Sequence, residues 1–322
     1  MSKKVKHILK IILPLLLGVF LVWYSLKSVP LPKIIAYWKA SNKSWILLGV
    51  FLGLLSHLSR AYRWRFQLEP MGHKIKFGNS VMAVFATYLI NYTIPRAGEV
   101  ARASILTNYE GVPFEKGFGT IVAERIADLI VMLSIICITL FLEFDFIYNF
   151  LIEKFNPVKI FIALTLLSVM AILFMLYIKK SNSKIALKIK TFVSGLIEGA
   201  LSIFKMKKKW AFVFHTLFIW SMYVLMFYVT SLAIEDLQGI STGAVLIGFI
   251  AASFSIAASN GGIGTYPVAI FLAFSIFGIS EDPSYAFGWI MWASQTLMII
   301  LCGGISLVYL PIYNRKKRHS LE

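Results

Sequence analysis

Residues 91–102 read NYTIPRAGEVAR and directly follow an apolar run, residues 81–90. Pro95 cannot donate a backbone hydrogen bond, and it biases the residue before it away from helical geometry. Gly98 permits a turn or the close approach of another backbone segment. The stretch therefore predicts the tip of a hairpin near residues 91–95, after which the chain restarts as a helix.

The composition indicates a membrane protein. The chain has 322 residues, 58% of them hydrophobic, and a mean hydropathy of +0.77. Soluble domains contain about 45–50% apolar residues. The stretches between the apolar segments are shorter than the ~50 residues that a soluble domain needs. We therefore expect one integral membrane domain, residues 1–322, of the all-α polytopic class.

The apolar segments predict about six full transmembrane helices, because a helical crossing takes about 20 apolar residues. The segments are 8–29, 45–65, 119–142, 158–178, 210–234 and 285–311. Two further regions, 78–118 and 240–283, are apolar but interrupted by Gly, Pro or charged residues. These two regions are candidates for broken or re-entrant helices.

The distribution of basic residues predicts the orientation, since Lys and Arg favour cytoplasmic loops. The linker 179–209 carries nine lysines and a single Glu, and residues 315–318 are basic as well. The loops at 235–236 and 281–282 are acidic. We expect a multi-pass protein of the inner (plasma) membrane with both termini in the cytoplasm. Basic residues in the membrane loops therefore account for the net charge of +17, which does not indicate nucleic-acid binding.

This orientation leaves both ends of region 78–118 at the cytoplasmic face and both ends of region 240–283 at the outer face. Each region is either a pair of crossings or a re-entrant hairpin, and their lengths favour hairpins. A first half, about 8–178, and a second half, about 210–311, thus carry the same pattern in opposite orientations. The sequence predicts an inverted-topology repeat, whose broken segments meet near the bilayer midplane.

The charges of the first hairpin suit an anionic ligand. The free N–H groups at the start of a helix favour an anion, and the planar guanidinium of Arg96 suits a phosphate. Glu99 and Arg102 are three residues apart, share a helix face and can form a pair. The alternative is a cytoplasmic loop whose charges are solvated.

A second charged group is ERIAD, residues 124–128, inside the apolar segment 119–142. A charge at membrane depth costs about 2.5–3.5 kcal/mol on insertion scales. We therefore expect Glu124, Arg125 and Asp128 to face the interior of the bundle, to pair, or to contact water. Arg125 would contact substrate, and the carboxylates would position it or exchange protons. The alternative is a structural ion network that ties this helix to Arg96 or Arg102.

The second broken region contains SNGGIGTYP, residues 259–267. Its glycines predict a hairpin tip with backbone amides that contact a ligand. The alternative is close helix packing through small residues. The candidate ligand-binding residues of this tip are Asn260, Gly261, Gly262 and Gly264.

The segment 45–65 also carries charge. We retain Arg60 as a candidate, and we expect Arg63 and Arg65 near the end of the helix to meet phosphates of the inner leaflet. His57 shares a face with Arg60, and we expect it to be a hydrogen-bonded residue of the helix packing.

Several motifs are missing from the sequence. It contains no phosphate-binding P-loop, no H-E-x-x-H, no nucleophile elbow and no Cys/His metal spacing. We expect no metal, no cofactor and no enzymatic activity.

The charged and glycine motifs together resemble those of the lysylphosphatidylglycerol synthetase transmembrane region family, a family of flippase-like membrane proteins. Asn260 stands where the family usually has a proline, and the Glu that usually follows the glycines is missing. The matching residues are Asn91, Pro95, Glu99 and Arg102, then Glu124, Arg125 and Asp128, and then Gly261, Gly262 and Gly264.

The resemblance implies movement of phospholipids or polyprenyl-linked lipids between leaflets. The best-known members also have a cytoplasmic domain that adds lysine to phosphatidylglycerol; the present sequence does not include it, and that activity is not carried over. We expect a translocase of an anionic phospholipid or polyprenyl-phosphate lipid, with membrane lipids as partners and a separate lipid-modifying enzyme as a further candidate partner. The alternatives are a membrane enzyme or scaffold subunit for lipid or lipid-linked glycan modification, and an ion-coupled small-solute transporter.

Overall fold

The computed structural model describes residue 16, residues 19–94, 96–154, 157–181 and 206–315, and residues 183, 186–187 and 189–190. These residues form helices and turns, and no strand occurs among them, so the protein is the predicted all-α polytopic membrane protein. In the described part of the chain, four helices are long and apolar enough to cross a membrane. They are Lys43–Met71, Phe114–Leu142, Lys209–Ser231 and Glu281–Tyr313.

The chain packs as two units, residues 1–121 with 207–322, and residues 122–206. The second unit holds most of α6 (Phe114–Leu142), together with α7 (Phe144–Lys154) and α8 (Pro157–Lys180). Large apolar side chains of α8 are exposed along its length, which suits a helix that faces lipid.

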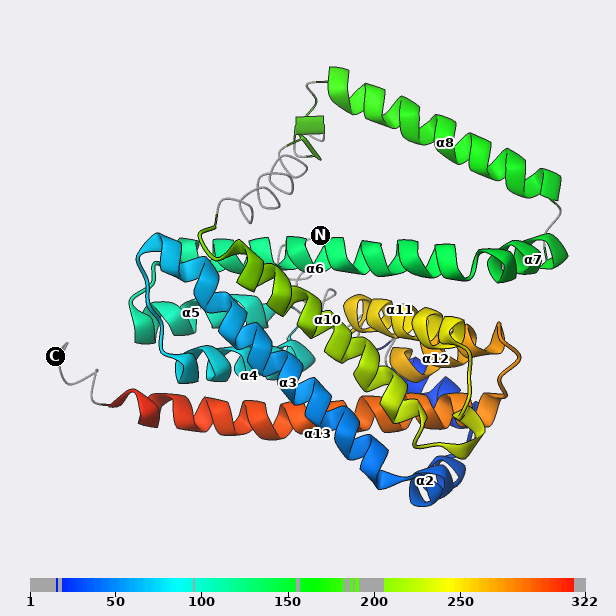
Figure 1. Ribbon diagram of the computed structural model, residues 1–322, viewed down its shortest axis with the longest axis horizontal. Coiled ribbons are helices and arrows are strands. Elements are labelled where there is room, and N and C mark those ends of the chain that lie inside the picture. Colours follow the sequence, from blue (N-terminus) through cyan, green and yellow to red (C-terminus); the bar gives the residue numbers. More distant parts are fainter. Residues whose placement is uncertain are drawn as a thin grey trace. The chain divides into compact units, whose positions relative to one another are not determined.

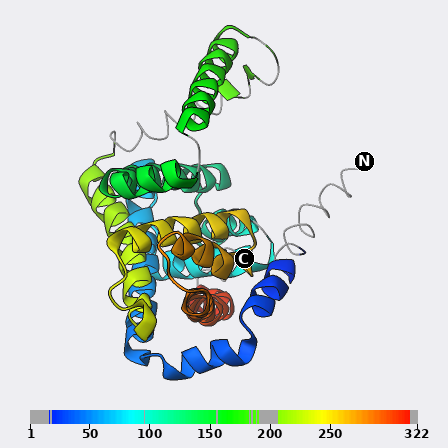
Figure 2. The ribbon, with the colours of Figure 1, turned by 90° about the vertical axis from the view of Figure 1, so that its right-hand side faces the viewer.

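Besides the helix Val19–Ser28, the first unit contains eight of the described α-helices, and α13 lies among the other seven (Figures 1 and 2). α13 packs against α2, α3, α4, α10 and α12, while α3 and α10 lie side by side. The helix Val19–Ser28 is bent by 74° relative to α2. The eight are α2 (Leu31–Ala40), α3 (Lys43–Leu68), α4 (Phe77–Thr93), α5 (Ala97–Glu110), α10 (Lys209–Ser231), α11 (Thr242–Ala258), α12 (Thr265–Ser275) and α13 (Glu281–Tyr313).

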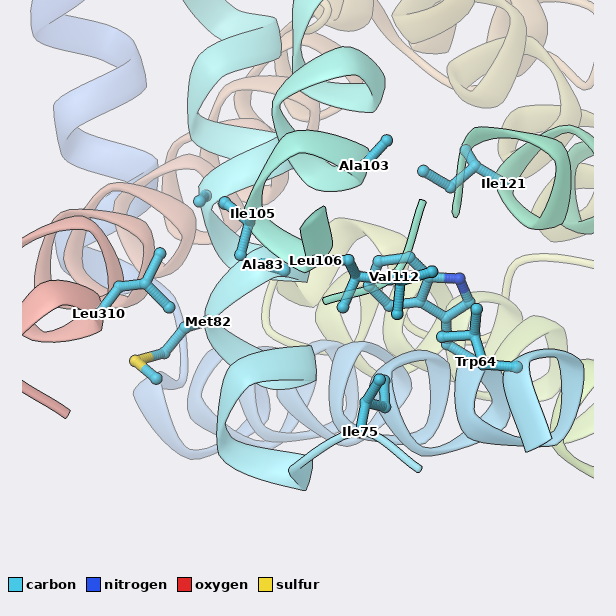
Figure 3. Packing of buried hydrophobic residues seen from close by; sticks show 12 residues of the cluster. Trp64, Ile75, Met82, Ala83, Ala103, Ile105, Leu106, Val112, Ile121 and Leu310 are labelled. Atoms are coloured by element: carbon cyan, nitrogen blue, oxygen red, sulfur yellow. The ribbon is translucent and has the colours of Figure 1, made fainter. Parts of the chain in front are cut away.

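An apolar core joins α3, α4, α5 and the end of α13. Figure 3 shows its members, with Trp64 of α3 beside Leu106 of α5 and Val112. Trp64 and Leu106 are fully buried. At the border of this core, Asn79 of α4 and Asn314 after α13 exchange hydrogen bonds of 2.9 and 2.7 Å. These contacts fix the start of α4 at the C-terminal end of α13.

Both predicted hairpins are made of short helices. α4 has 17 residues and α5 has 14, while α11 has 17 and α12 has 11. At a rise of 1.5 Å per residue these helices span about 17 to 26 Å, less than the ~30 Å hydrocarbon core. The two hairpins lie at opposite ends of α13 (Figure 1). α4 packs along the C-terminal half, where Leu89 lies against Gly303, and α12 along the N-terminal half, where Pro267 lies against Gly288.

The tips of the two hairpins meet at the middle of α13. Tyr92, at the end of α4, donates to or accepts from Thr296 of α13 over 3.1 Å. Trp292, one turn earlier on α13, donates its indole N–H to the carbonyl of Gly261 over 2.8 Å. The ring of Tyr92 covers Gly261 so closely that a Cβ there would overlap it. This meeting of broken segments is the arrangement that an inverted repeat predicts.

We expect Gly261→Ala to destabilise the protein, because the new methyl group would collide with the Tyr92 ring and Gly261 has a φ of +64°. Overpacking of this kind costs about 1–3 kcal/mol. Thermal unfolding of the purified protein measures the effect. Adding Tyr92→Ala should recover part of the loss, since it removes the ring.

Gly278→Ala is the matched control for that prediction. Gly278 has a similar φ of +71°, but nothing lies within 4 Å of a Cβ placed there. If Gly261→Ala and Gly278→Ala lower the unfolding temperature equally, the contact between the tips contributes nothing beyond backbone strain.

Candidate functional site

The first hairpin turns at Arg96. Ile94 is extended, with φ −128° and ψ 111°, and Arg96 has φ 61° and ψ 5°. Among the described residues, Arg96 is the one non-glycine residue with a positive φ. Such a conformation costs of order 1–3 kcal/mol and persists only where its surroundings impose it. The Arg96 side chain is exposed at this tip; the neighbouring Pro95 lies outside the described residues.

Asn91 closes the hairpin by bonding both to the start of α5 and to its first turn. Its side-chain oxygen accepts from the N–H of Gly98 over 2.8 Å, and its amide group donates to both carboxylate oxygens of Glu99 over 3.4 Å. A Cβ on Gly98 would overlap Asn91 and the carbonyl of Thr87. One N-terminal amide that the sequence analysis reserved for an anion is therefore occupied by Asn91.

Arg102 lies inside the first unit. Its side chain is 1% exposed, and its guanidinium lies 3.8 Å from the centre of the Trp64 ring, a cation–π contact. Trp64 in turn donates its indole N–H to Thr120 over 2.8 Å. The sequence left open the alternative that these charges are solvated in a loop. This alternative is correct for the exposed Arg96 and wrong for the buried Arg102.

α3 brings two more buried arginines to its contact with α10. Arg63 is fully buried; it donates to Thr216 over 2.7 Å and lies 5.0 Å from the centre of the Phe212 ring. Arg60 is also buried and donates to the hydroxyl of Tyr223 over 3.5 Å. The expectation that Arg63 meets leaflet phosphates is wrong, because α10 covers that face of α3.

The ERIAD residues differ in burial. Glu124 and Asp128 are buried, whereas the Arg125 side chain is 41% exposed and lies 3.7 Å from the Asp128 carboxylate. The two carboxylates are four residues apart and therefore share a face of α6. The carboxylates thus lie inside the protein, and Arg125 pairs with Asp128, which are two of the expected outcomes. Their pairing with Arg96 or Arg102 stays a prediction.

Hydrogen bonds of Ser259 stabilise the glycine-rich tip of the second hairpin. The Ser259 hydroxyl accepts from the N–H of Gly262 over 3.1 Å and lies 2.7 Å from the Thr265 hydroxyl. Asn260, Gly262 and Gly264 are buried. Close packing, the alternative of the sequence analysis, accounts for Gly261 beneath Tyr92. Ligand contact by this tip stays a prediction.

The buried arginines are chemically able to bind an anion. Three guanidinium groups lie buried on α3 and α5, those of Arg60, Arg63 and Arg102. A guanidinium donates in a planar fork that matches phosphate and carboxylate groups. Among the described residues, no cluster of three or more His, Cys, Asp or Glu side chains forms a metal site.

Sequence reasoning missed several residues of this region. Trp64, Thr216 and Tyr223 contact the buried arginines, and Tyr92, Trp292 and Thr296 join the hairpin tips. Thr216 and Tyr223 are seven residues apart on α10, and Arg63 and Arg60, which they contact, are three residues apart on α3. Helical periodicity is the signal that could have placed them on facing surfaces.

Comparison with known proteins agrees with these features. The family model described as the lysylphosphatidylglycerol synthase TM region matches residues 11–304. A UPF0104 membrane protein of Methanocaldococcus jannaschii is 27% identical over 292 residues, which cover 80% of this chain and 82% of the relative. The chain therefore belongs to the lysylphosphatidylglycerol synthase TM region family, and its membership implies a lipid-related role in the membrane.

Proposed function

We propose that this protein is a translocase that moves a lipid with an anionic headgroup between the leaflets of the plasma membrane. The observation that carries the proposal is the burial of Arg60, Arg63 and Arg102 inside a bundle of membrane helices. Ionisable groups at membrane depth are expensive, and they generally mark the path of a substrate or ion. An anionic headgroup is a substrate that needs such a path.

The free-energy cost of moving a charged headgroup across the membrane supports this proposal. A phosphate that leaves water for the hydrocarbon loses its hydration, at a cost that positive side chains along the path offset. Arginine suits this role because it stays charged and can hold phosphate through two parallel hydrogen bonds. The acyl chains would remain in the surrounding lipid, against the exposed apolar faces of the helices.

The two hairpins could give the lipid headgroup access to the site from either leaflet. They approach the middle of α13 from opposite ends, and their tips touch through Tyr92 and Gly261. Separating one hairpin from α13 at a time would open the path to one leaflet while the other stays closed. Alternating access around a central site works in this way in transporters with inverted repeats.

The ERIAD residues have a proposed role of their own. Arg125 is partly exposed and would contact the headgroup, while Asp128 would hold its guanidinium. Glu124 would carry a proton or orient an arginine. The transfer is proposed to leave the lipid chemically unchanged, so the protein is not proposed to be an enzyme.

Transfer of fluorescent phosphatidylglycerol in reconstituted vesicles tests the proposal. We expect Arg102→Lys to reduce the rate by about tenfold, the effect of losing ~1.4 kcal/mol of stabilisation, because lysine keeps the charge but lacks the planar fork. Arg125→Ala should abolish transfer and leave the protein folded, since its side chain is partly exposed.

Arg65→Ala serves as the control, because Arg65 lies at the edge of α3 with its guanidinium 5.4 Å from the Tyr62 ring centre. Transfer at the wild-type rate by well-folded Arg102→Lys and Arg125→Ala proteins would refute the site. Recovery of a chemically altered lipid would instead support a membrane enzyme, and solute flux without lipid movement would support a solute transporter.

The proposed orientation has its own test. Single cysteines introduced in the lysine-rich linker, for example at Lys207, should react with an impermeant reagent only from the cytoplasmic side. A cysteine at Glu235, in an acidic loop, should react only from the outer side. The reverse pattern of labelling would contradict cytoplasmic termini.

A further inference from the structure

Two of the buried side-chain atoms that have no hydrogen-bond partner among the described residues lie on α3 and α13 of the first unit. They are Nδ1 of His57 on α3 and Nε2 of Gln295 on α13. His57 is 7% exposed. A buried polar atom without a partner costs about 1–3 kcal/mol.

The two side chains lie close together, on helices that pack against each other. A Cβ added at Gly53 would overlap the side-chain oxygen of Gln295. Gly53 and His57 are four residues apart and therefore share a face of α3. The amide group of Gln295 thus reaches α3 about one turn before the imidazole of His57.

Further polar side chains surround this point. The His57 ring lies 4.5 Å from the Tyr88 ring of α4 and 6.2 Å from the Tyr223 ring of α10, measured between ring centres. Arg60, one turn after His57, donates to the Tyr223 hydroxyl. Helices α3, α4, α10 and α13 therefore all contribute to one polar cluster inside an apolar bundle.

This cluster is next to the junction of the hairpin tips. Gln295 directly precedes Thr296, which bonds to Tyr92 at the end of α4. Tyr92 covers Gly261 of the opposite hairpin. A group held by His57 and Gln295 would therefore lie where the paths from the two hairpins join.

The chemistry of the two atoms restricts the ligand. The amide nitrogen of glutamine only donates, so its partner must be an acceptor oxygen. The imidazole Nδ1 can donate to the same kind of oxygen in one tautomer. The positive charge of Arg60, one turn along the same helix, favours an oxygen that carries negative charge.

We propose that His57 and Gln295, with Tyr88, Tyr223 and Arg60 around them, form a central subsite that binds a phosphate oxygen of the lipid headgroup in transit. The assignment deepens the proposed function and rests on it. Arg102 and Arg63 would hold the headgroup on the side of the first hairpin, and the central subsite would receive it between the hairpins.

A purely structural role predicts a different response to mutation. Replacing an unpaired buried donor by an apolar group of similar shape is neutral or stabilising for folding. Gln295→Leu should therefore unfold at the same or a higher temperature than wild type in lipid-free detergent, while losing function. A buried water that bridges the two side chains would make the same variant less stable.

The test is thermal unfolding of delipidated protein in maltoside, with and without phosphatidylglycerol. A ligand that binds only the folded state raises the unfolding temperature. We expect phosphatidylglycerol to raise that of wild type, and His57→Phe and Gln295→Leu to lose at least half of the shift. Diacylglycerol, which has no phosphate, and free inorganic phosphate should give no shift.

The matched controls replace a histidine and a glutamine that lie outside the proposed subsite. His215 of α10 bonds to Ser59 over 2.8 Å, and Gln238 is exposed and bonds to the carbonyl of Leu232. His215→Phe and Gln238→Leu should keep the full lipid-induced shift. If phosphatidylglycerol shifts the unfolding temperature of wild type, His57→Phe and Gln295→Leu equally, the subsite is overturned. The subsite is also overturned if phosphatidylglycerol gives no shift in wild type, or if inorganic phosphate gives wild type an equal shift.

Vesicle transfer with the same variants separates this inference from the proposed function. If phosphatidylglycerol stabilises the protein through His57 and Gln295 but wild type transfers no lipid, the translocase proposal fails and the subsite stands. If wild type transfers lipid and both variants transfer it at the same rate with the full shift, the subsite fails and the translocase proposal stands.

Discussion

Backbone that is broken within a membrane cannot face lipid, because its N–H and C=O groups would lack partners there. The two short hairpins of this protein turn their tips toward each other on α13, an arrangement that would satisfy that constraint if the hairpins are re-entrant. Asn91 bonds to the start of α5, Ser259 bonds to Gly262, and Trp292 bonds to the carbonyl of Gly261. The close contact of the tips places polar side chains at the middle of α13.

The buried charged side chains, like the hairpin tips, are covered by protein. Arg102 stacks on Trp64, and Arg63 is bonded to Thr216 beneath α10, so both guanidiniums are covered by protein. Aromatic rings and hydroxyls hold these side chains in place. The proposed lipid transfer rests on these buried guanidinium groups, which are chemically able to bind an anionic headgroup.

The sequence predicted the helical class and the two hairpins, because Pro95, the interrupting glycines and the loop charges are local signals. It could not predict that α10 covers Arg63, since burial depends on a helix about 150 residues further along the chain. The contact of Tyr92 with Gly261 was hidden for the same reason. Asn91 was recognised through its motif, but its bonds to Gly98 and Glu99 required coordinates.

The central claim is that the buried arginines hold the phosphate of an unaltered lipid. Mass spectrometry of the lipids that remain bound after purification tests it most directly. Wild type should retain a chemically unmodified, phosphate-bearing lipid, and Arg102→Lys protein of equal stability should retain much less of it. Equal retention by both proteins, or retention of uncharged lipids alone, would contradict the claim.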